Sequence, residues 1–108
     1  MKTFRTLELA IEFHKSLEKL EISGHLKDQL FRAATSIPLN LAEGNAKQSV
    51  REKKRFYQTS YASLQECKTI LRIASCNDEK IVDMADKLGA WLYKLLRSEI
   101  KSIDHRNP

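Results

Sequence analysis

Two carboxylates are the side chains of this sequence best suited to acid–base chemistry. Glu43 and Glu66 fall on segments with helical periodicity, and two inward-pointing carboxylates would form a candidate proton-transfer site. The competing interpretation is structural, with each carboxylate accepting hydrogen bonds from a helix end or pairing with a cation such as Arg32. We favour the structural interpretation, and we expect a protein that is not an enzyme.

The histidines and cysteines lack the spacing of a metal or cofactor site. A di-iron helix bundle uses Glu-x-x-His, and no glutamate stands three residues before any histidine of this chain. There is neither a Cys-x-x-Cys pair nor a glycine-rich phosphate loop. We therefore expect no metal and no cofactor, with His14 as a packed or boundary residue. The three histidines are His14, His25 and His105.

Positive charge is concentrated in one part of the chain. The formal net charge is +5, yet residues 1–44 and residues 77–108 each contain six basic and six acidic side chains. Residues 45–76 contain seven basic and two acidic side chains, which favours contact with the phosphates of a nucleic acid. This segment has few aromatic residues for base stacking, so we expect backbone contacts. The predicted nucleic-acid-binding residues are Lys47, Arg51, Lys53, Lys54, Arg55, Lys68 and Arg72.

Helices must position these residues, because three glycines and two prolines leave little material for β-turns. Apolar periodicity predicts helices over residues 6–22, 25–43, 49–76 and 78–102. Ser49 followed by Glu52 predicts a capping box at the third helix, and residues 77–79 predict the start of the fourth. Short connections then predict an all-α domain over residues 1–108, an antiparallel up-down-up-down four-helix bundle.

The apolar faces are wider than one bundle core requires. On the third helix, residues 56, 60, 63, 67, 70 and 74 form a second stripe, and Met84 and Trp91 form a second surface on the fourth. We expect self-association to cover them, although they could also thicken the core. The predicted core face of the first helix is Leu7, Ala10, Ile11, His14, Leu17 and Leu20, widened by Leu9 and Phe13.

The segment 29–44 combines small residues with polar groups on an apolar helix. Pro38 removes a backbone donor and is predicted to kink the helix. Ser36 and Asn40 could bind the carbonyl that Pro38 frees or reach a neighbouring helix. Gly44 is predicted to end the segment as a left-handed cap. The segment is therefore expected to pack closely on another helix through a specific polar contact.

The remaining sequence signals concern the compartment. Cys67 and Cys76 are nine residues apart on one predicted helix, or about 13 Å, which excludes an intrachain disulfide. The sequence shows no leader peptide and no apolar run of about 18 residues. We expect a cytoplasmic protein that does not enter a membrane.

The segment 29–44 resembles the signature of a known family, Gln-x-x-x-Ala-Ala-x-Ser-Ile-x-x-Asn-Ile-Ala-Glu-Gly. A second signature, Ala-x-Gly-Ser-x-x-Glu, is matched by Ser63 and Glu66, with Ala62 in place of glycine and Ser60 in place of the first alanine. The family is that of bacterial four-helix-bundle proteins encoded in intervening sequences of 23S ribosomal RNA genes. The accessory variability determinant of diversity-generating retroelements is a relative. The residues that match the first signature are Gln29, Ala33, Ala34, Ser36, Ile37, Asn40, Leu41, Ala42, Glu43 and Gly44.

The resemblance implies a homopentameric, barrel-like ring without catalytic residues. It also implies binding of nucleic acid, RNA or DNA, and of a nucleic-acid-processing protein, as in the retroelement relative. Two alternatives stay open. One is a helix-turn-helix DNA-binding regulator, with residues 42–48 as the turn. The other is a protein-interaction scaffold whose partner docks on the surface of Met84 and Trp91. The residues with a predicted structural role in the signatures are Gln29, Ser36, Pro38, Asn40, Glu43, Gly44, Ser63 and Glu66.

Overall fold

The computed structural model describes the backbone of residues 2–106 and the side chains of residues 3–97. Within that range the chain forms four helices and no strand, which confirms the all-α prediction. The helices are α1 (Lys2–Ser16), α2 (Gly24–Ala46), α3 (Val50–Ile73) and α4 (Glu79–Arg106). None of them is long and apolar enough to cross a membrane over the part described.

The third helix starts at its predicted cap, Ser49, whereas the fourth is capped by Asp78 and not by Asn77, the residue before it that the sequence favours. The Ser49 hydroxyl accepts a hydrogen bond from the Glu52 amide at 3.1 Å, and Asp78 accepts one from the Ile81 amide at 3.2 Å. These bonds satisfy amides that a helix start leaves without a partner. At the other end, α4 continues to Arg106, beyond the predicted end at residue 102.

The predicted end of the first helix is wrong by six residues. The Ser16 hydroxyl donates to the Phe13 carbonyl at 2.6 Å, which is the acceptor that the Leu17 amide would use in a continued helix. The Leu17 amide bonds the His14 carbonyl instead, at 3.2 Å, and residues 17–23 become a connection. Lys27 holds this connection by donating to the Glu18 carbonyl at 3.1 Å. Helix α1 also begins at Lys2 rather than at residue 6.

The third helix ends three residues before its predicted end at Cys76. Ser75 adopts a left-handed backbone conformation with φ of 55°. Its amide bonds the Arg72 carbonyl at 3.0 Å, and the Cys76 amide bonds the Leu71 carbonyl at 2.9 Å. This pair of bonds is a Schellman motif, which usually places glycine where this chain has Ser75.

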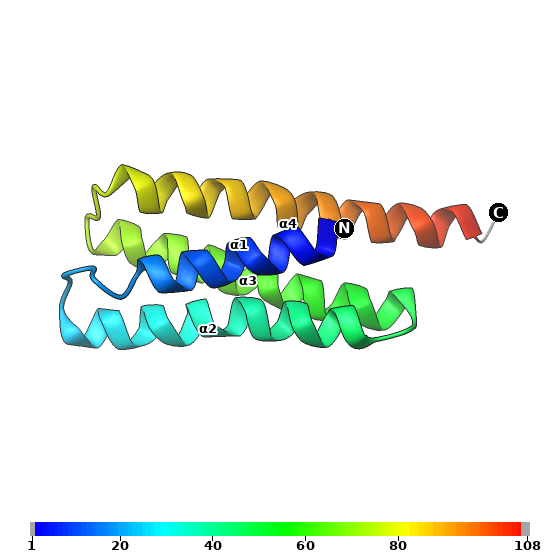
Figure 1. Cartoon of the computed structure of the whole chain (residues 1–108), viewed down its shortest axis with the longest axis horizontal. Coiled ribbons are helices and arrows are strands. Elements are labelled where there is room, and N and C mark those ends of the chain that lie inside the picture. The colour runs from blue at the N-terminus through cyan, green and yellow to red at the C-terminus, as the bar shows by residue number, and fades with distance from the viewer. Residues whose placement is uncertain (1, 107–108) are drawn as a thin grey trace.

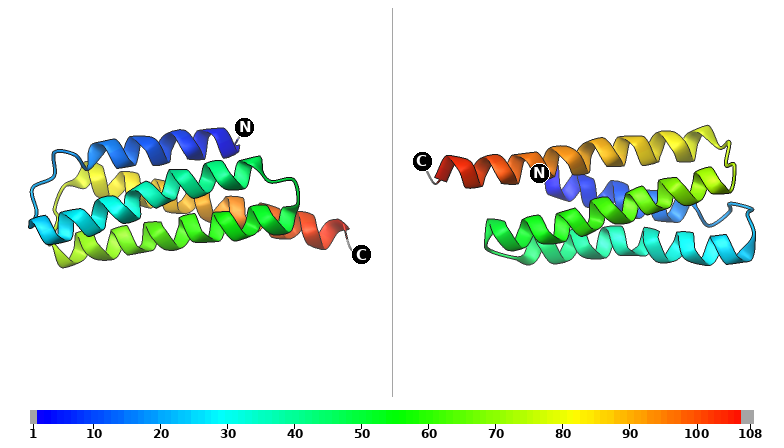
Figure 2. Two further views of the ribbon diagram at one scale, coloured as in Figure 1. Left: turned by 90° about the horizontal axis from the view of Figure 1, so that it is seen from below. Right: turned by 180° about the vertical axis from the view of Figure 1, so that it is seen from behind.

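Each helix packs on two others. Contacts join α1 to α2, α2 to α3, α3 to α4 and α4 to α1, so that the four surround one core (Figure 1). Connections 17–23 and 74–78 lie at one end of the bundle, and connection 47–49 lies at the other. Figure 2 shows the C-terminal part of α4 extending past the other helices. The rod measures 50 × 21 × 20 Å.

The core face of α1 is turned relative to the prediction. Thr6, Leu9 and Phe13 are buried, together with Ala10 and Leu17. The predicted central residues Leu7, Ile11 and His14 are only half-buried at the edge of that face. The two residues expected merely to widen the face, Leu9 and Phe13, therefore lie at its centre.

The second apolar stripes are largely used inside the bundle. On α3, Ser60 and Cys67 are fully buried, and the Ser60 hydroxyl donates to the Ile37 carbonyl of α2 at 2.9 Å. On α4, Met84 and Trp91 are half-buried and pack against the core. These stripes thus thicken the core, the alternative to self-association noted above. The large apolar side chains that stay exposed among residues 3–97 are Phe4, Leu39, Ile73, Val82 and Tyr93.

Candidate nucleic-acid interface

A polar contact joins α2 to α3 at the predicted signature residues. The Ser63 hydroxyl donates to the Ser36 hydroxyl at 2.8 Å, across the two helices. Asn40 Nδ2 lies 2.8 Å from the Ser36 carbonyl and 2.9 Å from its hydroxyl. Helix α2 continues through Pro38 without interruption. Of the two roles predicted for Ser36, the structure shows contact with the neighbouring helix.

Gly44 permits the closest approach of α2 and α3 and is not a left-handed cap. It is buried inside α2, and no described glycine has a positive φ. A Cβ atom on Gly44 would lie 2.7 Å from Cε1 of Tyr57. The Tyr57 hydroxyl donates to Oδ1 of Asn45 at 2.7 Å, which fixes the ring against the glycine. Close packing, and not backbone conformation, therefore explains Gly44.

The predicted carboxylate pair does not exist. Glu43 and Glu66 are both exposed, so the possibility that they point inward is wrong. Glu43 forms an ion pair with Lys47 at 3.8 Å, one helical turn away, and not with Arg32. Gln29 is exposed as well. These three signature residues, and Ala42 as well, thus lie on the surface of the single chain, where core packing does not explain them.

The histidines and cysteines also have structural surroundings. His14 Nε2 lies 2.9 Å from the Thr35 hydroxyl, and its ring contacts Phe31 edge-on at 5.3 Å. No cluster of metal-ligating side chains occurs among residues 3–97. Cys67 is buried in α3, and burial, with Glu66 next to it as a smaller cause, raises the pKa of its thiol from 9.0 to about 12. The side chain of His105 lies outside the described residues.

Three of the seven predicted nucleic-acid-binding residues contact other parts of the protein. Lys53 donates to the carbonyls of Gly44 and Asn45 at 3.4 and 3.3 Å, and so caps the end of α2. Lys68 pairs with Asp86 of α4 at 3.0 Å. Lys47 pairs with Glu43, as noted above. The positive charges of these three lysines are therefore partly neutralised or already engaged within the protein, so they contribute less to the predicted binding surface.

The remaining cations at this end of α3 face solvent. Arg51 and Arg55 are exposed and Lys54 is half-buried. Within the described residues none of the three has an acidic partner. The Arg55 guanidinium lies 5.4 Å from the centre of the Phe56 ring, and the Lys47 ammonium lies 5.3 Å from the same ring. We call Arg51, Lys54 and Arg55 the α3-start cations.

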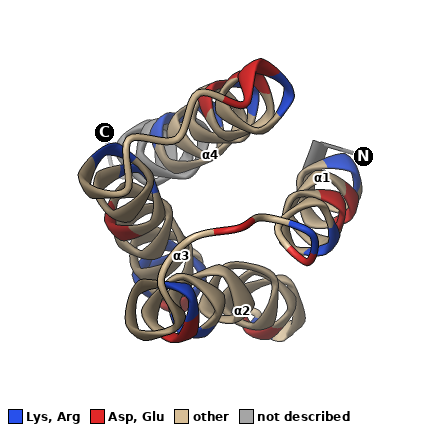
Figure 3. Cartoon of the chain, turned by 90° about the vertical axis from the view of Figure 1, so that its left-hand side faces the viewer, with Lys and Arg blue, Asp and Glu red and all other residues tan. Residues whose placement is uncertain are grey.

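The basic residues do not form one continuous patch on the single chain. Lys68 and Arg72 lie near the opposite end of α3, about 20 Å and more along the helix axis from Arg55. Figure 3 shows that acidic and basic segments lie side by side on α1 and α4. The α3-start cations, near connection 47–49, are therefore the strongest concentration of unpaired positive charge in the described structure.

Comparison with known proteins places this structure in a family. The family model described as 23S rRNA-intervening sequence protein matches residues 2–88. The chain belongs to this family. The range that matches the intervening sequence protein family includes α1, α2, α3 and the first turns of α4. All seven predicted nucleic-acid-binding residues lie within this range. Among curated proteins no match is found.

Sequence reasoning missed one cationic region altogether. Arg5 of α1 and Lys94 of α4 line a hollow beside Trp91. Arg5 and Lys94 are separated by most of the chain, so no local sequence pattern indicates that they lie close together. Trp91 and Lys94 also lie beyond the range matched by the intervening sequence protein family.

Proposed function

We propose that this chain is a non-enzymatic, RNA-binding member of the 23S rRNA-intervening sequence protein family, and that the α3-start cations bind RNA phosphates. The observation that carries the proposal is that these three cations have no acidic partner among residues 3–97, on a segment that holds the whole net charge. Three cations at one helix start oppose the helix dipole, so they are not explained by the stability of α3. RNA is the favoured polyanion because the family is named after 23S rRNA.

We further propose that the chain folds as an antiparallel up-down-up-down bundle and assembles into a homopentameric ring in the cytoplasm. A ring would repeat the α3-start cations and give an RNA several equivalent contacts, which raises avidity. Exposed Leu39 and Ile73, at 61% and 64% of their full surface, are apolar groups that an interface would cover. Light scattering should then give a mass of about 62 kDa, five times 12.5 kDa. A mass of 12.5 kDa would refute the assembly.

The test of RNA binding is a charge reversal that leaves the structural cations in place. In the variant Arg51→Glu/Lys54→Glu/Arg55→Glu, Lys53 keeps its cap on α2. We expect loss of RNA retardation in a gel, with helicity retained. The matched control reverses three exposed cations elsewhere, Lys15, Lys19 and Lys80, and has the same net charge. If both variants bind RNA like the unmodified chain, or if both lose binding equally, the α3-start cations are not the site.

A helix-turn-helix DNA regulator is a weaker candidate. Helix α3 has 24 residues, which is long for a recognition helix, and from Tyr57 onward one of its faces is buried against its neighbours. Protection of one DNA sequence in a footprinting experiment would favour this candidate. Protection of RNA without sequence preference would favour the phosphate-binding proposal.

A further inference from the structure

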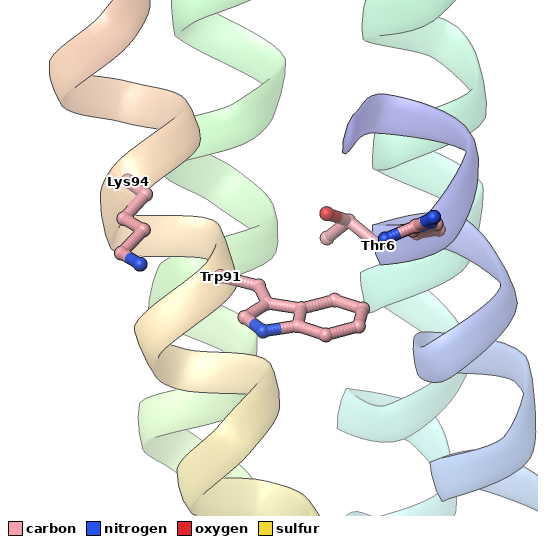
Figure 4. Close-up of a pocket in the computed structure, with 4 residues that line it drawn as sticks. Thr6, Trp91 and Lys94 are labelled. Atoms are coloured by element: carbon pink, nitrogen blue, oxygen red, sulfur yellow. The ribbon is translucent and has the colours of Figure 1, made fainter. Parts of the chain in front are cut away.

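A hollow of about 190 Å³ lies between α1 and α4, lined by Arg5, Thr6, Trp91 and Lys94. Figure 4 shows the indole of Trp91 projecting from α4 towards Thr6 of α1, with Lys94 one turn further along α4. We call this the Trp91 hollow. It combines an aromatic surface and two cations from the neighbouring helices α1 and α4, which are groups that bind an aromatic anion.

A second hollow, of about 220 Å³, has a different charge. It shares Arg5 and Trp91 with the first, and its other charged residues are Lys87, Glu8 and Glu12. The Lys87 ammonium lies 5.0 Å from the centre of the Trp91 ring. Two acids therefore balance two cations in this second hollow. Among residues 3–97, the Trp91 hollow is lined by two cations and no acid, so these residues favour an anion there.

The cations of the Trp91 hollow are available to a ligand. Arg5 and Lys94 are exposed, and within residues 3–97 neither forms an ion pair or a hydrogen bond from its side chain. Trp91 is half-buried, so its position is set by packing on the core. The indole is therefore held in place before a ligand binds, which favours affinity, whereas the two exposed cations must be ordered on binding.

We propose that the Trp91 hollow binds one unpaired nucleotide of a single-stranded RNA, with the base against the indole and the phosphate between Arg5 and Lys94. Its volume is below the roughly 300–1,000 Å³ of pockets for whole drug-sized ligands, which suits one ring of a longer chain. Stacking of bases on aromatic side chains beside basic residues is how proteins hold single strands. This inference rests on the proposed RNA-binding function and adds the single-stranded state as the form recognised.

The Trp91 hollow and the α3-start cations lie towards the same end of the bundle. The start of α1 and connection 47–49 are both found at this end (Figure 1).

Fluorescence tests this directly, because Trp91 is the single tryptophan of the chain. We expect saturable quenching by single-stranded oligouridylate and by uridine monophosphate at higher concentration. Duplex RNA of the same length, whose bases are stacked, should quench little, and inorganic phosphate should not quench. Equal quenching by duplex RNA, or by an acidic peptide, would overturn the assignment to an unpaired nucleotide.

Variants separate the hollow from the α3-start cations. Arg5→Gln and Lys94→Gln should each weaken uridine monophosphate binding about tenfold, the effect of one lost charge-assisted hydrogen bond. The control Lys80→Gln removes an exposed cation of the same helix outside both hollows and should change nothing. If neither Arg5→Gln nor Lys94→Gln weakens quenching, the proposal is wrong.

Failure of this inference differs from failure of the proposed function. The variant with the α3-start cations reversed should lose RNA retardation and still show quenching by uridine monophosphate. RNA retardation by the unmodified chain without any quenching at Trp91 would refute the hollow alone. Quenching without RNA retardation would refute the α3-start cations as the main contact.

Discussion

Replacement of Gly44 by alanine tests the close approach of α2 and α3. The added Cβ would lie 2.7 Å from Cε1 and 3.0 Å from Cδ1 of Tyr57, and 3.1 Å from Cβ of Phe56. Carbon atoms in good contact are about 3.5–4.0 Å apart, so the first distance is short by nearly 1 Å. The Tyr57 ring is fully buried and its hydroxyl is bonded to Asn45 at 2.7 Å, so the ring cannot move away freely.

The expected loss follows from three opposing contributions. Overpacking of a tight core costs about 1–3 kcal/mol. Displacement of Tyr57 would also weaken its bond to Asn45, a loss of about 1 kcal/mol. Alanine regains about 1 kcal/mol of helix propensity over glycine. The Gly44→Ala variant should therefore be less stable by about 1–3 kcal/mol.

The assay is urea unfolding followed by circular dichroism, at one protein concentration throughout so that any assembly affects all variants alike. Gly89→Ala is the matched control, because its Cβ would meet only Cδ2 of Leu64 at 3.4 Å. That variant should be neutral or more stable by up to about 1 kcal/mol. In a Tyr57→Leu background, Gly44→Ala should cost less. If Gly44→Ala is as stable as the unmodified chain, the reasoning about this contact is wrong.

Four further outcomes are expected. Ser75→Gly should stabilise the protein by about 1 kcal/mol in urea unfolding, because glycine relieves the left-handed backbone, whereas Ala74→Gly at φ −78° should not. Arg51→Glu should raise stability by about 0.3–1 kcal/mol through the helix dipole while it weakens RNA binding in a gel. A thiol reagent at pH 8 should modify Cys76 and not Cys67. Because folding raises the Cys67 pKa to about 12, its contribution to stability should be complete below pH 9 and decline above it.

Features set by neighbouring residues were predictable from the sequence. Ser49 caps the helix that it was expected to start, because a cap bonds an amide only three residues away. At the fourth helix the cap is Asp78, one residue after Asn77, which the sequence had favoured as the cap. Apolar periodicity likewise identified four helices, since each needs one buried face. The end of α1 was not predictable in this way. In its last turn the Ser16 hydroxyl donates to the Phe13 carbonyl, a bond that a serine in a continuing helix can also make, so the local sequence does not mark the end.

Features set by distant residues were not predictable. From the sequence alone, Gly44 could end a helix, because it follows an apolar helical segment. Its actual role, which is to leave room for the Tyr57 ring of α3, becomes clear only when the two helices are placed side by side. The face of α1 was misplaced for a similar reason. The apolar residues of α1 cover more than half of the helix circumference. The positions of α2 and α4, which pack on α1, decide which of these residues are buried.

The candidate site was predictable in location but not in composition. The charge count identifies residues 45–76, because it needs no knowledge of the fold. It cannot show that Lys53 caps α2 or that Lys68 pairs with Asp86, since both contacts cross between helices. Trp91 was predicted to belong to a partner-binding surface, but the cations beside it in the Trp91 hollow, Arg5 and Lys94, come from the two ends of the chain and were missed. Three cations of the seven predicted ones therefore carry the proposal.

The salt dependence of RNA affinity tests the role of the α3-start cations most directly. It is measured with single-stranded RNA between about 50 and 200 mM salt, where each phosphate contact contributes about 0.7 to the slope of log affinity against log salt. The variant Arg51→Gln/Lys54→Gln/Arg55→Gln should lower the magnitude of this slope by roughly 2 for each protomer in contact with the RNA. An unchanged slope would contradict phosphate binding by these three residues.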